Sequence, residues 1–283
     1  MANDPDPRAV TTSHPGIPTD TIDKLARIWA SVSELGAGLT EQEWKTPTEL
    51  PGWTVQDNLA HLIGTERMLE GLPATEHRSG AREHVHNAIG AFNENEVDAR
   101  RGSAGTEVLV EWDGLAARRL AALRSAGADY FAAEAMTPTG PGTVADFLHI
   151  RILDCWAHEQ DIRRALGRPG HLDGPAAEHT IDRLIRTLPI VVGKRAGTPE
   201  GATVVIELTG PVHRVIPVTV AEGRAKIVAD VPADVLAQVS MDSETFMMLA
   251  TGRRTSGDLA ERWSVDGDQT LGNAIASHLN MMI

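Results

Sequence analysis

One long predicted helix constrains the fold of this chain more than any other feature. Between residues 151 and 167 the apolar residues recur at close to the helical period, and a glycine and a proline end the pattern. Asp154 and His158 are four residues apart, so both side chains project from one face of this helix, and Asp161 continues that face. A carboxylate and an imidazole placed in this way can hold one metal ion, and a third ligand must then come from elsewhere.

The candidate for the third ligand lies far upstream. Thr54 is followed three residues later by Asp57, which is close to a capping box, so a helix is predicted to begin here and to carry His61 two turns in. Two histidines and one carboxylate form a common catalytic zinc set with an open fourth position. The spacing alone also fits a hydrogen-bonded core histidine and a helix-surface pair, and the same ligand types suit other metals.

Both stretches resemble the metal-bearing helices of the mycothiol-dependent maleylpyruvate isomerase family, a branch of the DinB-like four-helix bundles. The similarity covers residues 50–62 and 154–167, and continues in residues 249–253 and 265–272 near the end of the chain. In that family a His, a Glu and a His hold the metal. The resemblance therefore implies a divalent metal, Zn²⁺ foremost, held by His61, Asp154 and His158. The aspartate is a departure, because its side chain is one methylene shorter than that of glutamate.

The fold class expected from the whole chain is α+β. A flexible tail over residues 1–19 is predicted to precede a DinB-like helix bundle over residues 20–195. A small α+β domain with an antiparallel sheet follows over residues 200–283, and the resemblance implies that it is sterol-carrier-like. The predicted helices span residues 20–39, 55–69, 87–101, 106–125, 143–167, 174–193, 242–251 and a last segment from 269. The predicted strands span residues 202–209, 212–220, 224–230, 235–240 and 263–265.

Several conspicuous residues are predicted to have structural rather than chemical roles. The connection 126–142 is expected to be irregular, and the histidine-rich segment 74–86 to be a solvated loop, with a lid over the bundle as the alternative. Cys155 points about 100° away from its neighbour Asp154 on the helix, so we expect a buried core thiol. Packing in the core is also the expected role of Trp53, Trp112 and Trp156.

Composition limits the partners and the compartment. The chain has 26 Lys and Arg against 39 Asp and Glu, a formal charge of −13, which argues against nucleic acid and anionic membranes as partners. A single cysteine cannot form an internal disulfide, which favours a reducing, cytoplasmic setting. No apolar run is long enough to cross a bilayer, and the first residues lack the apolar core of a signal peptide. We expect a monomer or a homodimer.

The predicted chemistry is that of a metal-activated thiol. A thiol that enters the open coordination position would lose its proton and become a nucleophile. The resemblance implies that this thiol is mycothiol and that the chain is an isomerase or an S-transferase acting on a small electrophile. In the isomerase, the thiolate adds to the cis double bond of maleylpyruvate, rotation follows, and elimination leaves fumarylpyruvate. Arg253 matches a family arginine that holds an acidic substrate, a role suited to a planar guanidinium.

Two other classes remain open at the level of sequence. A metal-dependent hydrolase, or an oxygen-using iron enzyme, could use the same two histidines and one carboxylate, and added thiol would then be irrelevant to activity. A non-catalytic protein could instead bind a small apolar molecule in its C-terminal domain, and a substitution of His158 would then leave ligand binding intact.

Overall fold

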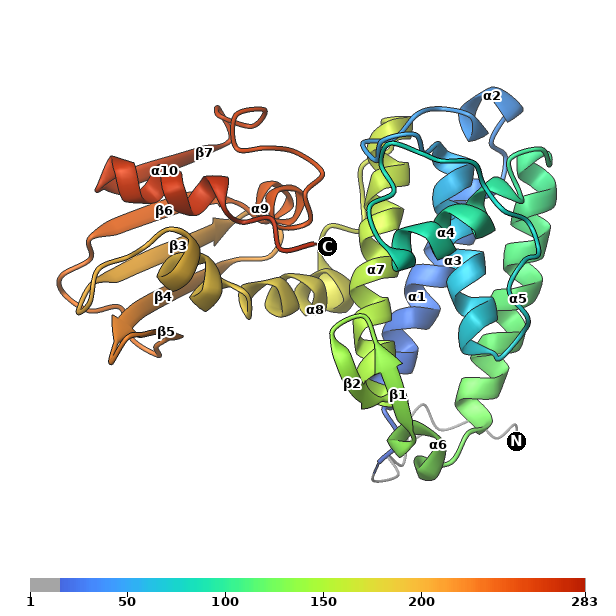
Figure 1. The fold of residues 1–283 in the computed structure, drawn as a ribbon, viewed down its shortest axis with the longest axis horizontal. Coiled ribbons are helices and arrows are strands. Elements are labelled where there is room, and N and C mark those ends of the chain that lie inside the picture. Colours follow the sequence, from blue (N-terminus) through green and yellow to red (C-terminus); the bar gives the residue numbers. More distant parts are fainter. Residues whose placement is uncertain (1–15, 283) are drawn as a thin grey trace, which may run out of the picture.

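The computed structural model describes residues 16–282, and helices dominate its first two thirds (Figure 1). The predicted tail falls largely outside this range. The first elements are α1 (Thr19–Gly36), α2 (Glu41–Trp44), α3 (Val55–Leu69), α4 (Ala88–Asp98), α5 (Gly105–Ser125), α6 (Ala128–Ala132), β1 (Glu134–Thr137), β2 (Gly140–Thr143), α7 (Val144–Leu166) and α8 (Gly174–Ile185). The second part contains η1 (Ile190–Arg195), β3 (Thr203–Thr209), β4 (Arg214–Ala221), β5 (Arg224–Ile227), β6 (Ala237–Asp242), α9 (Ser243–Ala250), β7 (Trp263–Gly267) and α10 (Gln269–Ser277).

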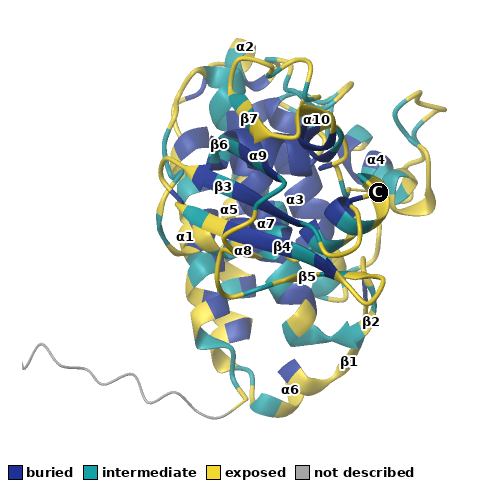
Figure 2. Ribbon diagram, turned by 90° about the vertical axis from the view of Figure 1, so that its left-hand side faces the viewer, coloured by how far each residue is buried: buried dark blue, intermediate teal, exposed yellow. Residues whose placement is uncertain are grey.

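Helices α1, α3, α5 and α7 form a four-helix bundle, as expected. Helix α1 packs against α5 and α7, and α3 also packs against both. Their apolar faces meet in a core where Trp29 and Trp112 pack edge to face with ring centroids 6.0 Å apart. Figure 2 shows that the buried residues concentrate on the inward faces of the helices and on the sheet. Helix α4 covers α3 from outside this core.

Short-range signals in the sequence set where the two ligand-bearing helices begin and end. The predicted capping box is present at the start of α3, where Thr54 and Asp57 bond to each other's backbone N–H groups. Helix α7 begins in the same way, with Thr143 and Asp146. It ends at Gly167, whose φ of 61° is the left-handed conformation that glycine adopts without strain. These signals therefore determine how many turns from each helix start the potential ligands lie.

The segment between α5 and α7 differs from the irregular connection that the sequence suggested. It contains the short helix α6 and the antiparallel hairpin β1–β2, which packs against α7. The Pro-Thr-Gly-Pro run is the turn of that hairpin: Gly140 has a φ of +113°, and the Thr137 hydroxyl donates to the Gly140 carbonyl over 2.8 Å. A run rich in turn residues was thus mistaken for a structureless loop.

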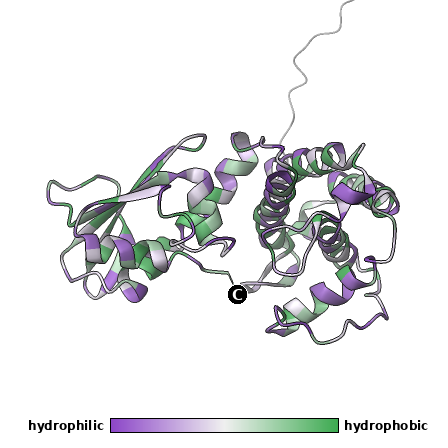
Figure 3. Ribbon diagram, turned by 90° about the horizontal axis from the view of Figure 1, so that it is seen from above, coloured by the Kyte–Doolittle hydropathy of each residue, from purple (hydrophilic) through white to green (hydrophobic). Residues whose placement is uncertain are grey.

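Helix α8 connects the bundle with the second part of the molecule (Figure 1). It packs against α1 and α7 on the bundle side and against α9 on the other. The helix predicted over residues 174–193 ends at Ile185, and residues 190–195 instead form a π-helix that contacts β5 and α10. The domain boundary between residues 195 and 200 stays a prediction. Figure 3 shows the bundle and the second part side by side.

The five-stranded sheet has the order β5-β4-β3-β6-β7, with α9 and α10 packed against it. The predicted antiparallel arrangement is confirmed for β3 with β4, β4 with β5, and β6 with β7. Strands β3 and β6 pair in parallel. After β3 the chain forms β4 and β5 on one side of that strand, then crosses to its other side, where β6 runs in the same direction as β3. The second part is therefore the expected small α+β unit, with a mixed sheet at its centre. None of the helices within residues 16–282 combines the length and the apolar character that a membrane span requires.

The contact between α2 and α5 can be tested with two alanine substitutions on one helix. A Cβ added at Gly105 would lie 2.0 Å from Cγ of the buried Trp44, so we expect Gly105→Ala to lower the free energy of unfolding by about 1–3 kcal/mol. Gly114 lies on the same helix and is exposed, with nothing within 4 Å of such a Cβ. Gly114→Ala should raise the stability by about 0.5–1 kcal/mol. Denaturant unfolding of both variants checks this, and equal midpoints would contradict the packing described.

Candidate metal centre

The three predicted ligands meet between α3 and α7. His61 extends from α3, and Asp154 and His158 extend from adjacent turns of α7. One ligand atom from each residue lies within 4.8 Å of the other two. Within residues 16–282 this is the one grouping of three such side chains that could hold a metal ion. Helix packing thus brings together residues that are 93 positions apart in the chain.

Two distances in this triad are compatible with a shared metal ion. The Nε2 atom of His61 lies 3.3 Å from one carboxylate oxygen of Asp154, and the Nε2 atom of His158 lies 3.4 Å from the other. In a tetrahedral site with bonds of about 2.0–2.2 Å, ligand atoms lie roughly 3.3–3.6 Å apart. The aspartate is therefore long enough to share an ion with both histidines.

Asn58 determines which nitrogen of His158 is free. Its side-chain NH₂ group donates to the Thr54 carbonyl over 2.9 Å, so its amide oxygen faces His158 Nδ1 at 2.7 Å. Because that oxygen can only accept, Nδ1 carries a proton, so Nε2 is the nitrogen that has a lone pair whenever the ring is neutral. A lone pair facing a carboxylate is repulsive unless a proton or a metal cation lies between them. Such a hydrogen bond to the outer nitrogen is the usual support of a metal-binding histidine.

The charges around Asp154 keep it ionised. Burial alone would raise the pKa of Asp154, but the guanidinium of Arg151 and the imidazole of His61 hold that pKa well below its usual range. Burial lowers the pKa of His61 and favours its neutral form. Burial also acts against charge on His158, but hydrogen bonds to Asp154 and Asp161 outweigh it and raise that pKa. An anionic carboxylate between two imidazoles is the charge arrangement that a divalent cation requires.

A buried ion-pair array lies beneath the triad, and our interpretation of the sequence did not anticipate it. Arg151 bonds to Asp154 and also donates from Nε to Glu66 over 2.9 Å. The other oxygen of Glu66 accepts from Arg119 over 3.2 Å. The side chains of Arg151, Glu66 and Arg119 are nearly inaccessible to solvent. The signal was present in the sequence, since Arg151 is three residues before Asp154 and thus on the same face of α7.

Arg253 reaches the back of the site from the second part of the molecule. It lies just after α9, is only 6% exposed, and grips Asp161 through Nη2 at 2.8 Å and Nε at 3.2 Å. Asp161 in turn lies 3.3 Å from Nδ1 of His158. Burial opposes ionisation of Asp161, but the charge of Arg253 and the hydrogen bond from His158 keep its pKa low. Arg164 adds a further ion pair to this carboxylate at 2.7 Å.

Trp53 covers the two histidine rings. Its ring centroid lies 5.4 Å from that of His61 and 5.9 Å from that of His158. The indole N–H donates to Glu94 over 3.0 Å, which determines the orientation of the ring. Trp112 and Trp156 are core residues, as expected. Trp53 also packs, but it packs against the proposed ligands.

The histidine-rich segment lies outside the triad. Residues 73–87 form no helix or strand, in agreement with the predicted loop. His77 Nε2 lies 2.6 Å from Asp98, and His84 Nε2 lies 3.0 Å from Glu94. Both contacts attach the loop to α4. The lid alternative stays a prediction.

Cys155 is a core residue, as predicted. Its side chain is inaccessible, and burial raises the pKa of its thiol to about 12. A thiol with that pKa is protonated at neutral pH, and the thiolate is the reactive form. Any thiol chemistry at the triad must therefore use a thiol from outside the chain.

The fold and the site together define a protein with a four-helix bundle, a small α+β unit and a potential metal site in the bundle. Two family models match this chain in succession: the mycothiol maleylpyruvate isomerase N-terminal domain over residues 25–163 and the MDMPI C-terminal domain over residues 178–274. Together they cover most of the sequence. The chain belongs to the mycothiol-dependent maleylpyruvate isomerase family.

Individual relatives are distant. Two uncharacterized proteins from two strains of Mycobacterium tuberculosis are each 27% identical over 242 residues, which is 81% of this chain and 86% of theirs. Two crystal structures of the mycothiol-dependent maleylpyruvate isomerase, one of them of a mutant, superpose with TM-scores of 0.56 and 0.54 at 18% identity. Each match covers 88% of this chain and 92% of the other. At that identity the structures establish the shared fold.

The burial of Cys155 leads to a direct test. Because the thiol is inaccessible and protonated, we expect no reaction of the folded protein with Ellman's reagent at pH 8. After unfolding in guanidinium chloride, one thiol per chain should react, since the sequence has a single cysteine. Rapid reaction of the folded protein would contradict the core assignment and would reopen the question of an internal nucleophile.

Proposed function

We propose that this protein is a metal-dependent enzyme that uses mycothiol as its thiol cosubstrate and acts on a small electrophile as an isomerase or S-transferase. The observation that carries the proposal is the His61–Asp154–His158 triad, whose two Nε2 atoms lie 3.3 and 3.4 Å from one ionised carboxylate. The family membership of the chain supports the identity of the thiol. The names of the solved structures support an isomerase of the maleylpyruvate type.

The residues present fit a divalent cation, and we propose Zn²⁺. His61 and His158 would supply Nε2, and Asp154 would supply a carboxylate oxygen. When bound there, Zn²⁺ would lower the pKa of an entering thiol and hold it as the nucleophilic thiolate. Aspartate replaces the glutamate of the family pattern, but its distances to both histidines suit the same role.

Burial determines how substrates would approach. The side chains of His61 and His158 are only 7% and 8% exposed, whereas that of Asp154 is 25% exposed. The open position would therefore be on the side of Asp154. Trp53 covers the rings on another side and would keep water away from them. Because Cys155 is buried and protonated, the nucleophile in this proposal comes from the cosubstrate.

The surrounding residues would orient the ligands. Asn58 and Asp161 hold Nδ1 of His158, so that Nε2 stays aimed at the shared position. Arg151 bonds to Asp154 but leaves acceptor sites on its carboxylate, because a carboxylate offers about four lone pairs. A cation and a guanidinium can therefore share this group.

Arg253 also has N–H donors that are not used within the protein and that could bind an acidic substrate. Three of its N–H groups are used, two on Asp161 and one on the Thr251 carbonyl. A guanidinium has five N–H donors, so two remain for a carboxylate of the electrophile. We propose that Arg253 both orients His158 through Asp161 and offers these donors to the substrate.

Metal analysis of the full chain tests the ligand set. After purification with zinc supplied, we expect about one equivalent of metal in the wild type and a loss of most of it in His158→Ala. His213→Ala is the matched control, because His213 is an exposed histidine of the second part of the molecule. Thiol-dependent turnover should follow metal content. Equal metal in wild type and His158→Ala, or turnover that ignores added mycothiol, would contradict the proposal and favour a hydrolase or a binding protein.

Arginine-to-lysine substitutions test the role of Arg253. Lysine cannot reproduce the two-point contact with Asp161, so Arg253→Lys should lower kcat/KM for an acidic substrate by about 10–100-fold. Arg254→Lys should stay within about twofold, because Arg254 is 47% exposed and pairs with Glu49 at the surface. Steady-state kinetics would separate the two roles: loss of substrate contact raises KM, and loss of His158 orientation lowers kcat. Unchanged kinetics in Arg253→Lys would exclude both.

A further inference from the structure

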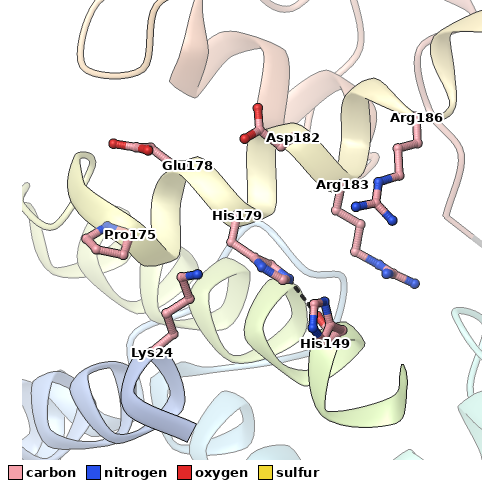
Figure 4. A pocket seen from close by; sticks show the side chains of 8 residues that line it. All are labelled: Lys24, His149, Pro175, Glu178, His179, Asp182, Arg183 and Arg186. Carbon is pink, nitrogen blue, oxygen red and sulfur yellow. Dashed lines mark hydrogen bonds between the residues drawn. The ribbon is translucent and has the colours of Figure 1, made fainter. Parts of the chain in front are cut away.

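A second pocket opens between α1, α7 and α8, and it contains none of the triad residues (Figure 4). Its volume is about 240 Å³. That is smaller than the roughly 300–1,000 Å³ of pockets that enclose drug-sized ligands, so it suits a single small group. The side chains that line it are those of Lys24, His149, Pro175, Glu178, His179, Asp182, Arg183 and Arg186.

Two cations of the pocket, Arg183 and Arg186, lack an ion-pair partner among the described residues. Within residues 16–282, no carboxylate lies within 4 Å of the guanidinium of Arg183 or Arg186. Burial and the neighbouring charge of Arg186 lower the pKa of Arg183, which is the effect expected of cations that crowd each other. Lys24 adds a third cation, which pairs with the exposed Asp20 on its own helix. An anion among these groups would relieve their repulsion.

The acidic residues of the lining are directed elsewhere. Asp182 pairs with Arg214 of β4 at 2.8 Å, and Glu178 lies 3.9 Å from the same arginine. Figure 4 shows both carboxylates pointing away from the group formed by His149, His179 and Arg183. Asp146 at the start of α7 is near enough to interact with the charge of Arg183, but it forms no ion pair with it, and one of its oxygens accepts from the N–H and hydroxyl groups of Thr143. The interior of the pocket is therefore cationic.

The two histidines are neutral and do not form a metal site. Burial lowers the pKa of both, that of His179 to about 4, and three cations nearby oppose a metal ion. The Nε2 atom of His179 lies 3.0 Å from the backbone carbonyl of His149, so it carries the proton and donates. Nδ1 of His179 is then an acceptor that could bond to a hydroxyl group of a ligand.

We propose that this pocket binds a doubly charged phosphate group through Arg183 and Arg186. Guanidinium groups bind phosphate oxygens in two-point contacts, and a tetrahedral phosphate has enough oxygens for both of them. The net charge of the chain is −13, so general attraction of anions to its surface does not account for such a site. The group belongs either to free phosphate or to a phosphate monoester.

The pocket lies against α8, the helix that connects the bundle with the sheet. Asp182 on α8 already pairs with Arg214 on β4. A phosphate held by Arg183 of α8 and by Arg186 just after it would sit beside this connecting helix, where the helix packs against the bundle.

Calorimetric titration of the zinc-loaded full chain in phosphate-free buffer tests the proposal. The probes are inorganic phosphate and glycerol 3-phosphate, with sodium chloride added to match ionic strength. We expect a wild-type Kd below about 1 mM for at least one probe, and tighter binding of the monoester would identify an ester as the natural form. Arg186→Gln should weaken binding by at least about tenfold, as should Arg183→Gln if it folds. Because Arg186 is exposed, its replacement should leave the fold intact.

Two control variants distinguish binding in this pocket from binding elsewhere on the protein. Arg27 is an exposed arginine of α1 outside the pocket, so Arg27→Gln should bind as the wild type does. His158→Ala should also keep its affinity, because the pocket is independent of the metal centre. Absence of binding to the wild type, equal weakening in Arg27→Gln, or loss in His158→Ala with retention in Arg186→Gln would overturn the proposal. The last result would place phosphate on the metal instead.

Discussion

The carboxylate of Asp154 is the group on which the rest of the site depends. It lies between the Nε2 atoms of two histidines, and a buried guanidinium from Arg151 bonds to it from below. A largely buried charge persists only when it is paired, so Arg151 needs Glu66, and Glu66 is paired again by Arg119. This chain of charges links α3, α5 and α7. The same ion pairs that keep Asp154 anionic therefore cross between three helices of the bundle.

The second part of the molecule contributes a contact to the site. Arg253 contacts Asp161, and Asp161 lies beside the outer nitrogen of His158. An arginine that follows α9 thus reaches the surroundings of a proposed ligand in the bundle. Arg164 and Arg254 share Glu49 in the same interface, at 2.6 and 2.7 Å.

Much of the fold was predictable because its signals are local. Thr54 with Asp57 caps α3 as the spacing of these residues indicated, and Thr143 with Asp146 caps α7 through the same local pattern. Predictions failed where a local pattern had two meanings. The proline- and glycine-rich run after Thr137 is a hairpin turn instead of a loop, and the apolar stripe after Ile185 continues as a π-helix. The parallel pairing of β3 with β6 depends on how the chain returns to the sheet, which no residue pattern within either strand records.

The sequence by itself determined the helices, their caps and the one-turn spacing of Asp154 and His158, because these follow from interactions over three or four residues. Together with the family resemblance, it also led to His61 as the third member of the triad. Only the tertiary structure decided that the two Nε2 atoms face one carboxylate, that Asn58 sets the tautomer of His158, and that Trp53 covers both rings. The contacts of His61, Asn58 and Trp53 with residues of α7 join positions about a hundred residues apart. They depend on the angle and register of helix packing, which side chains throughout the core determine together.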